Sequence, residues 1–321
     1  MIKYIFFLFF MSPLVMYGQK DKNLASAEVI KLKKEIFKII KKNSMFTNSL
    51  DWNEVARESD ALKLNGNDST DTKILFDFFT QKLRKVGDKH SFFISKKSIS
   101  KIIETQLPIP PQADYLGEGI AWVKVPPCLT FDAVKDKAFA NTIRSEIKRI
   151  DSGQKVSGWI VDLRHNTGGN MWPMLAGLNA LIENGTVGYF VDPNSNKKQP
   201  WISQNGKLNS STINNYKIEN IKVKIAVLID SMTGSSGEMT AISFLGLPNV
   251  KTFGQPSAGY TTANQTYFLS NGSQLLLAVQ FVADRTGKPY KDMIIPDVHV
   301  KDLSNTKSDG VILAAKKWLL Q

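Results

Sequence analysis

The residues best suited to chemistry lie in a small-residue turn at 233–238, with the sequence Thr-Gly-Ser-Ser-Gly-Glu. An apolar run at 221–230 precedes this turn and predicts a buried strand, and the residues that follow predict a helix. Such a turn places Ser235 at a helix N-terminus, where free backbone N–H groups and the helix dipole favour a developing negative charge. The pattern therefore indicates a nucleophilic serine.

A second turn, about seventy residues upstream, offers backbone hydrogen-bond donors. The predicted strand at 159–164 runs into a turn at 165–170 that contains Gly168 and Gly169. Exposed N–H groups of a glycine turn can form an oxyanion pocket. A nucleophile turn combined with a donor turn indicates acyl transfer.

Each turn also has a purely structural interpretation. Ser235 and Glu238 have the spacing of a capping box, in which the serine caps a helix and the glutamate reaches back to it. Gly168 and Gly169 fit an ordinary turn or helix start. The combination of both turns in this order favours the functional interpretation, with the capping box left open as the alternative.

Length and composition indicate a folded protein of ordinary type. The chain has 321 residues, of which 42% are hydrophobic, 10% aromatic and 22% charged, so it can bury a sizeable core. The formal net charge is +12, but the lysines are scattered over predicted helix faces without interleaved aromatics or zinc-finger spacing. We therefore expect solvated helix faces and no nucleic-acid partner.

Residues 1–18 predict a secretory signal. A basic start at Lys3 precedes an apolar run at 4–17, which is too short for a spanning helix, and the chain turns polar after Gly18. We expect cleavage after Gly18, an exported protein in the periplasm or outside the cell, and no stable membrane insertion afterwards. An uncleaved N-terminal anchor is the alternative, while a cysteine-linked lipid anchor is excluded because no cysteine is near the junction.

Cys128 is the only cysteine of the chain, so no internal disulfide can form. It lies in an apolar stretch with no candidate base nearby, which predicts a small buried hydrophobic residue and not a nucleophile.

Hydrophobic periodicity divides the chain into two parts. Residues 24–105 predict an N-terminal helical domain, and the prolines at 108, 110 and 111 mark its boundary. Residues 112–321 alternate between strands and helices, which predicts an α/β core with a parallel sheet and late antiparallel strands, and a polar loop at 194–215. The expected strands are 119–125, 158–163, 222–229, 250–253, 265–269 and 273–282, and the expected helices are 74–83, 131–150, 171–182, 236–245 and 311–320.

Five short segments together carry a family resemblance. They are 87–92, 162–169, 233–238, 254–259 and 295–298, and their order is that of the family. The chain resembles the serine peptidases related to tail-specific (C-terminal processing) proteases, the tricorn protease core and interphotoreceptor retinoid-binding protein. The resemblance implies a ClpP/crotonase-like spiral core of ββα units with an N-terminal helical cap.

The resemblance also implies roles for individual residues. Ser235 is then the nucleophile, and the N–H groups of Ser236 and of Gly168 or Gly169 form the oxyanion hole. Tail-specific proteases have a lysine base where this chain has Tyr260, and a phenol with a pKa of about 10 is a poor base at neutral pH. The chain therefore resembles the tricorn-type branch, in which a histidine matching His90 is the base.

The partner that orients His90 is left open. Lys89 occupies the position of that branch's orienting serine, and the segment 286–293 has no glutamate. Asp88, Asp284 or Asp292 could supply the orienting carboxylate. His165, close to the donor turn, is an alternative base, whereas His299 is expected on a strand or at the surface.

Tail-specific proteases have a PDZ domain between the N-terminal region and the core. Here the stretch between His90 and Gly117 is too short for such a domain, so we expect substrate specificity to depend on a cleft between the helical cap and the core. The prediction is a secreted serine endopeptidase that cleaves a peptide or protein substrate through an acyl-enzyme, without metal or cofactor. One alternative is a non-catalytic binding protein on the same scaffold. Another is a crotonase-like acyl-CoA enzyme, which the export signal disfavours. The oligomeric state stays open.

Overall fold

The structure is a computed structural model that describes residues 25–105, 109–130, 132–182, 184–204, 207–208, 211–212, 216–218, 220, 222–301 and 309–321. The predicted signal at 1–18 lies outside these residues.

Within the described residues, a six-stranded sheet forms the centre of the core, in the order β14-β10-β9-β4-β3-β2. All neighbours in it are parallel except β2, which is antiparallel to β3. Strand β4 is buried along its whole length, as expected for a parallel strand that is covered on both faces. The strands are β2 (Gln112–Tyr115), β3 (Ile120–Lys124), β4 (Gly158–Asp162), β9 (Lys224–Ile229), β10 (Val250–Gly254) and β14 (Val298–His299).

Helices cover the two faces of this sheet. On one face, Val123, Trp159 and Val227 pack into a large cluster with residues of α5 (Ala133–Gly153), α6 (Met171–Gly177), α7 (Asn179–Ile182) and α8 (Ser236–Ile242). On the other face, alternate residues of the same strands, such as Ile160 and Leu228, pack against α9 (Gly310–Leu319).

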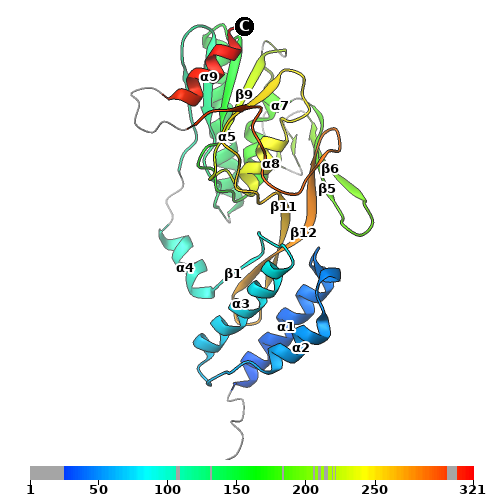
Figure 1. Cartoon of the computed structure of the whole chain (residues 1–321). Coiled ribbons are helices and arrows are strands. Elements are labelled where there is room, and N and C mark those ends of the chain that lie inside the picture. Colours follow the sequence, from blue (N-terminus) through cyan, green and yellow to red (C-terminus); the bar gives the residue numbers. More distant parts are fainter. Residues whose placement is uncertain are drawn as a thin grey trace, which may run out of the picture.

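An antiparallel sheet extends from the core toward the N-terminal helices. The part of the chain that the structure describes gives it eight strands, in the order β1-β12-β5-β6-β7-β8, with β11 and β13 also paired to β12. In Figure 1, β11 and β12 run from the core down to the N-terminal helices. The strands are β1 (Phe92–Ile94), β5 (Gly185–Val191), β6 (Lys198–Gln204), β7 (Lys207–Leu208), β8 (Ser211–Thr212), β11 (Thr262–Phe268), β12 (Gln274–Asp284) and β13 (Pro289–Tyr290).

The N-terminal helices share a hydrophobic cluster with this sheet. They are α1 (Ala27–Asn43), α2 (Trp52–Asp60) and α3 (Asp68–Lys85), with a short 3-10 helix (Thr47–Ser49) after α1, whereas the described residues of α4 (Lys96–Thr105) lie outside this cluster. The apolar face of α1, formed by Val29, Leu32, Ile36 and Ile40, is buried, and it packs with Leu275 and Leu277 of β12. The N-terminal helices and β12, which are far apart in the sequence, therefore share one hydrophobic cluster.

Most predicted elements of the core are present, and several predictions need correction. The predicted loop at 194–215 contains β6, β7 and β8. In β6 only Trp201 and Ser203 are buried and most exposed residues are polar, so its sequence resembles that of a loop. The predicted helix at 171–182 is two helices, and the predicted strand at 265–269 begins at Thr262. The N-terminal region contains β1 between its helices.

Candidate active site

Ser235 lies in a tight turn between β9 and α8, in a backbone conformation that is unusual for a residue with a side chain. Its φ is 53° and its ψ is −122°, and such a conformation costs about 1–3 kcal/mol unless its surroundings hold it. The carboxylate of Glu238 holds it here, because Oε2 accepts the N–H of Ser235 at 2.9 Å. The structure therefore contains the glutamate contact of the capping box, which is compatible with a reactive serine.

The side chain of His90, a residue 145 positions before Ser235, contacts the Ser235 hydroxyl. Its Nε2 lies 3.0 Å from Ser235 Oγ. Its Nδ1 lies 3.0 Å from the carbonyl oxygen of Thr262 and 2.9 Å from the Thr262 hydroxyl. Because a carbonyl oxygen can only accept, Nδ1 carries the proton in the neutral ring, and Nε2 has its lone pair free for the hydroxyl of Ser235.

The surroundings of His90 keep the imidazole uncharged. The residue is only 7% exposed, and this burial lowers its pKa to about 4, against the opposing effects of the Thr262 carbonyl and of Asp88. The charge of Arg84 lowers this pKa further. At neutral pH the ring is therefore in the form that can accept a proton.

The three aspartates considered for orienting the ring make other contacts. Asp88 is buried and accepts the backbone N–H groups of His90 and Ser91, so it fixes the loop. Asp284 accepts from Thr286 and Tyr290. Asp292 forms an exposed ion pair with Lys89 at 3.3 Å. Among the described residues, Thr262 is the partner of Nδ1, and no sequence motif announces a backbone carbonyl in this role.

The other two histidines lie apart from this arrangement. His165 is exposed, with its Nδ1 3.1 Å from Asp230 and 3.3 Å from the sulfur of Met232. His299 is exposed on β14, as expected for a strand or surface residue.

The donor turn after β4 packs directly against the serine turn. Gly168 and Gly169 have φ values of 111° and 108°, and a Cβ on Gly168 would lie 2.8 Å from the Cβ of Ser235. Ser236 Oγ donates to the carbonyl of Gly169 at 2.5 Å, and Gly234 N–H donates to the carbonyl of Asn166 at 2.9 Å. The two turns therefore hold each other in place.

The backbone donors near Ser235 differ in availability. The N–H of Gly168 is already donated to Asn166 Oδ1 at 3.0 Å. The N–H groups of Gly169 and Ser236 have no hydrogen-bond partner among the described residues. Of the two expected glycines, Gly169 is thus the one whose N–H has no partner among the described residues, as is also true of Ser236.

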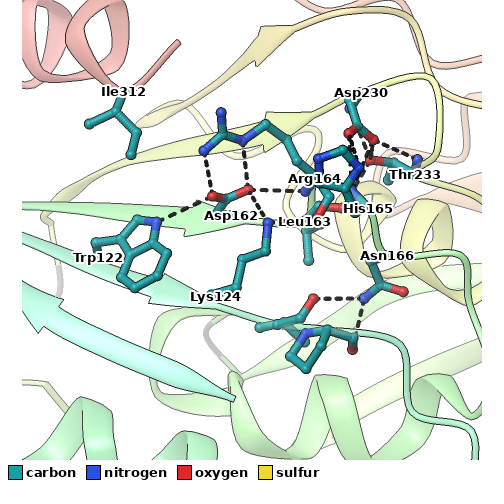
Figure 2. Close-up of polar contacts among 12 residues, drawn as sticks. Trp122, Lys124, Asp162, Leu163, Arg164, His165, Asn166, Asp230, Thr233 and Ile312 are labelled. Atoms are coloured by element: carbon teal, nitrogen blue, oxygen red, sulfur yellow. Dashed lines mark hydrogen bonds and ion pairs between the residues drawn. The ribbon is translucent and has the colours of Figure 1, made fainter. Parts of the chain in front are cut away.

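A buried polar cluster anchors the donor turn (Figure 2). Figure 2 shows Asp162, at the end of β4, between Lys124 and Arg164, with the indole of Trp122 donating to it. Asn166 donates to the carbonyls of Val125 and Pro126 at 2.9 and 3.2 Å. These contacts hold the chain before the turn and at Asn166 within it, so the backbone donors that follow have a defined position.

A cleft of about 940 Å³ opens over Ser235 and His90. Its walls come from both parts of the molecule: β1 and α4 on one side, and the core on the other. Most of the lining is apolar, and three charged side chains, Arg84, Lys89 and Asp136, also face it. The lining includes Phe92, Ile94, Leu129, Met171, Trp172, Phe190, Tyr260 and Leu276. A cleft of this size accommodates an extended peptide segment.

The described residues also show the state of the single cysteine. Cys128 is buried, as predicted, and burial raises the pKa of its thiol to about 12. No group of three or more His, Cys, Asp or Glu side chains in the described residues could hold a metal ion. In the same residues, every helix is too short or too polar to cross a membrane.

Comparisons with known proteins agree on one family. The model of peptidase family S41 matches residues 121–300. The nisin-resistance protein of Lactococcus lactis subsp. lactis is 38% identical over 271 residues, which cover 83% of this chain and 81% of that protein. A lipoprotein structure from Streptococcus agalactiae is 27% identical with a TM-score of 0.76, covering 94% of this chain and 99% of that one.

A more distant structure shows that the fold is shared more widely. The photosystem II D1 C-terminal processing protease has a TM-score of 0.62 at 13% identity and covers 92% of this chain and 98% of its own. The α/β fold therefore matches a processing-protease core, as the resemblance implied. Together with the extent of the family match, these findings show that the chain belongs to peptidase family S41 and is a serine-type peptidase.

Proposed function

We propose that the protein is an exported serine endopeptidase in which Ser235 is the nucleophile and His90 the general base. The observation that carries the proposal is the 3.0 Å contact between Ser235 Oγ and His90 Nε2, with Nδ1 held by Thr262. Two free N–H groups, of Gly169 and Ser236, lie in the turns that meet at this serine. Nucleophile, base and donors are the parts that acyl transfer requires.

In the proposed reaction, Ser235 Oγ bonds to the substrate carbonyl carbon while its proton passes to His90 Nε2. The N–H groups of Gly169 and Ser236 stabilise the resulting oxyanion. The C–N bond then breaks, and the imidazolium returns the proton to the leaving amine. Water, deprotonated by the same ring, attacks the acyl-enzyme and releases the acid, which restores Ser235.

The substrate class follows from the cleft and from one relative. The cleft is open and mostly apolar, which suits a peptide segment with apolar side chains. Because the curated relative is named for nisin resistance, we infer that a peptide of this kind is the substrate, and nisin is the first one to assay. We further propose that the helical part at 24–105 and the core at 112–321 are two domains that enclose the cleft, and that a signal at 1–18 directs export.

Labelling with a fluorophosphonate probe tests the proposed nucleophile. The wild-type protein should be labelled, Ser235→Ala should not, and His90→Ala should react about 10²–10⁴-fold more slowly. His165→Ala is the matched control, because its ring is exposed and contacts Asp230 and Met232 instead. A wild type that resists the probe would point instead to a binding protein on a peptidase scaffold, and equal labelling of Ser235→Ala would show that the probe reacts with another residue.

A further inference from the structure

Tyr260 lies against the imidazole of His90. The two ring centroids are 5.4 Å apart and the ring planes differ by 22°, so the rings are stacked. His90 is 7% exposed and Tyr260 is 40% exposed. The phenol ring therefore stands between one face of the imidazole and the solvent.

The backbone of Tyr260 is fixed by the same carboxylate that fixes Ser235. Glu238 is fully buried, and its Oε2 accepts the N–H of Tyr260 at 2.8 Å and that of Ser235 at 2.9 Å. Its Oε1 accepts the N–H of Gly259 at 2.8 Å. A shift of the Tyr260 loop would thus break contacts that also hold the serine turn, so the aromatic ring and Ser235 keep a fixed relation.

No direct hydrogen bond joins the two rings in the described contacts of Tyr260, so its effect on His90 acts through packing and the exclusion of water. An imidazole free to rotate about its side-chain bonds would lose its contacts with Thr262 at Nδ1 and with Ser235 at Nε2. Packing against a planar face restricts this rotation, and it also removes water that would otherwise compete for Nε2.

We propose that Tyr260 is a positioning residue: its ring covers one face of the His90 imidazole, excludes water from it and holds Nε2 toward Ser235. This inference rests on the proposed function of His90. Tyr260 supplies no proton in this role, which predicts that the aromatic ring matters and the hydroxyl does not.

Substitution of Tyr260 removes none of the other charged groups near His90, so we expect their effect on the imidazole to be the same in wild type and variant. They come from the end of α3 and the following loop, from α8 and from the loop before Ile294. These groups are Arg84, Asp88, Lys89, Glu238 and Asp292.

Nuclear magnetic resonance titration of the histidine rings tests the proposal without any reaction. In the wild type the His90 midpoint should be at about pH 4. Tyr260→Ala should raise this midpoint by about one unit or more toward 6.5, because water then reaches the charged form. Tyr260→Phe should leave it unchanged. The exposed rings of His165 and His299 serve as internal references, and Met293→Ala, an exposed neighbour in the next loop, is the matched control.

Reactivity provides the second measurement. At about pH 5, Tyr260→Ala should react with the fluorophosphonate about 10-fold more slowly, with Tyr260→Phe within about twofold of wild type. For peptide cleavage the fall should lie in kcat more than in KM. An unmoved His90 midpoint in Tyr260→Ala, a wild-type midpoint near 6.5, or a rise in KM alone would overturn the proposal. A wild type that shows the shifted midpoint but resists the probe would defeat the proposed function and leave the ring contact standing.

Discussion

At the scale of single residues, the site depends on a histidine that is buried yet has a hydrogen-bond partner on each nitrogen. Thr262 holds Nδ1 and Ser235 faces Nε2. Burial disfavours the charged ring, and the fixed partners decide which nitrogen has the lone pair. The same burial makes the protonated intermediate of the reaction costly, so the oxyanion and the nearby Asp88 must offset that cost during turnover.

The pH dependence of labelling follows from the lowered pKa of His90. Only the neutral ring accepts the proton of Ser235, and the neutral fraction rises as pH rises through the folded pKa of about 4. The rate of fluorophosphonate labelling should therefore increase through about pH 4 and be level by about pH 6. A profile with its midpoint near 6.5, the ordinary value for histidine, would contradict the buried environment described here.

Gly168→Ala should disable the site while sparing the rest of the molecule. Its φ of 111° disfavours any side chain, and the new methyl group would lie 2.8 Å from the Cβ of Ser235. We expect labelling of Ser235 to fall by about 100-fold or more, because small displacements at a reacting group are costly. Gly153→Ala, where the new Cβ meets nothing within 4 Å, is the control. Equal labelling of both variants would show that the serine turn tolerates the displacement.

Sequence reasoning reached those site residues that a motif contains, and it missed contacts that backbone groups make. Spacing and resemblance pointed to Ser235 and His90, and the structure places these two side chains in contact. The sequence left Gly168 and Gly169 equivalent, since nothing in it shows that Asn166 already accepts the N–H of Gly168. The sequence also suggested aspartates as partners of the His90 ring. In the structure His90 Nδ1 instead contacts the backbone carbonyl of Thr262, and a backbone carbonyl leaves no signal in a sequence because every residue has one.

At the scale of elements, the parallel sheet places the donor turn and the serine turn at the same edge. Strands β4 and β9 are adjacent and parallel, so the loops that leave their carboxyl ends meet. These strands were predictable because their apolar runs are continuous. The hairpin of β5 and β6 was not predicted. An antiparallel strand that is mostly exposed, such as β6, has few buried residues and so gives little hydrophobic periodicity in the sequence.

The ion pairs at the end of β4 should contribute more to the free energy of unfolding than an ordinary surface ion pair. Arg164 binds buried Asp162 through two nitrogens and also reaches Asp309 at the start of α9. Arg164→Met should lower the free energy of unfolding by about 2–4 kcal/mol, because it leaves a buried carboxylate with fewer partners. Urea unfolding measures this change. Arg149→Met breaks an exposed pair with Glu146 and should lower the free energy of unfolding far less; a similar loss in both variants would refute the distinction.

At the scale of the whole molecule, the site exists only where the helical part meets the core. The segment that carries His90 continues into β1, and β1 pairs with β12. Leu275 and Leu277 of β12 are buried in the cluster of the N-terminal helices. The relative placement of His90 and Ser235, the proposed base and nucleophile, is thus supported by packing far from either residue. The sequence could not show this, because the contacts join segments that lie more than half a chain apart.

Leu275→Ala should therefore weaken both folding and reactivity. Removing a fully buried leucine side chain costs about 2–5 kcal/mol, and labelling of Ser235 should slow as the His90 loop loses its support. Thermal unfolding should remain one cooperative transition, since β12 belongs to both parts. Leu313→Ala, an exposed position on α9, should change neither property. Unaltered labelling in Leu275→Ala would show that the helical cluster does not support the site.

The order of the site's parts along the chain has a consequence for biosynthesis. His90 is translated early, Ser235 much later, and Thr262 and the β12 strand that backs the His90 loop emerge later still. A ribosome-bound fragment that ends before residue 284 lacks part of this assembly. The proposed active site is therefore incomplete on the growing chain until β12 has been synthesised, and we expect the nascent polypeptide to cleave no peptide before that point.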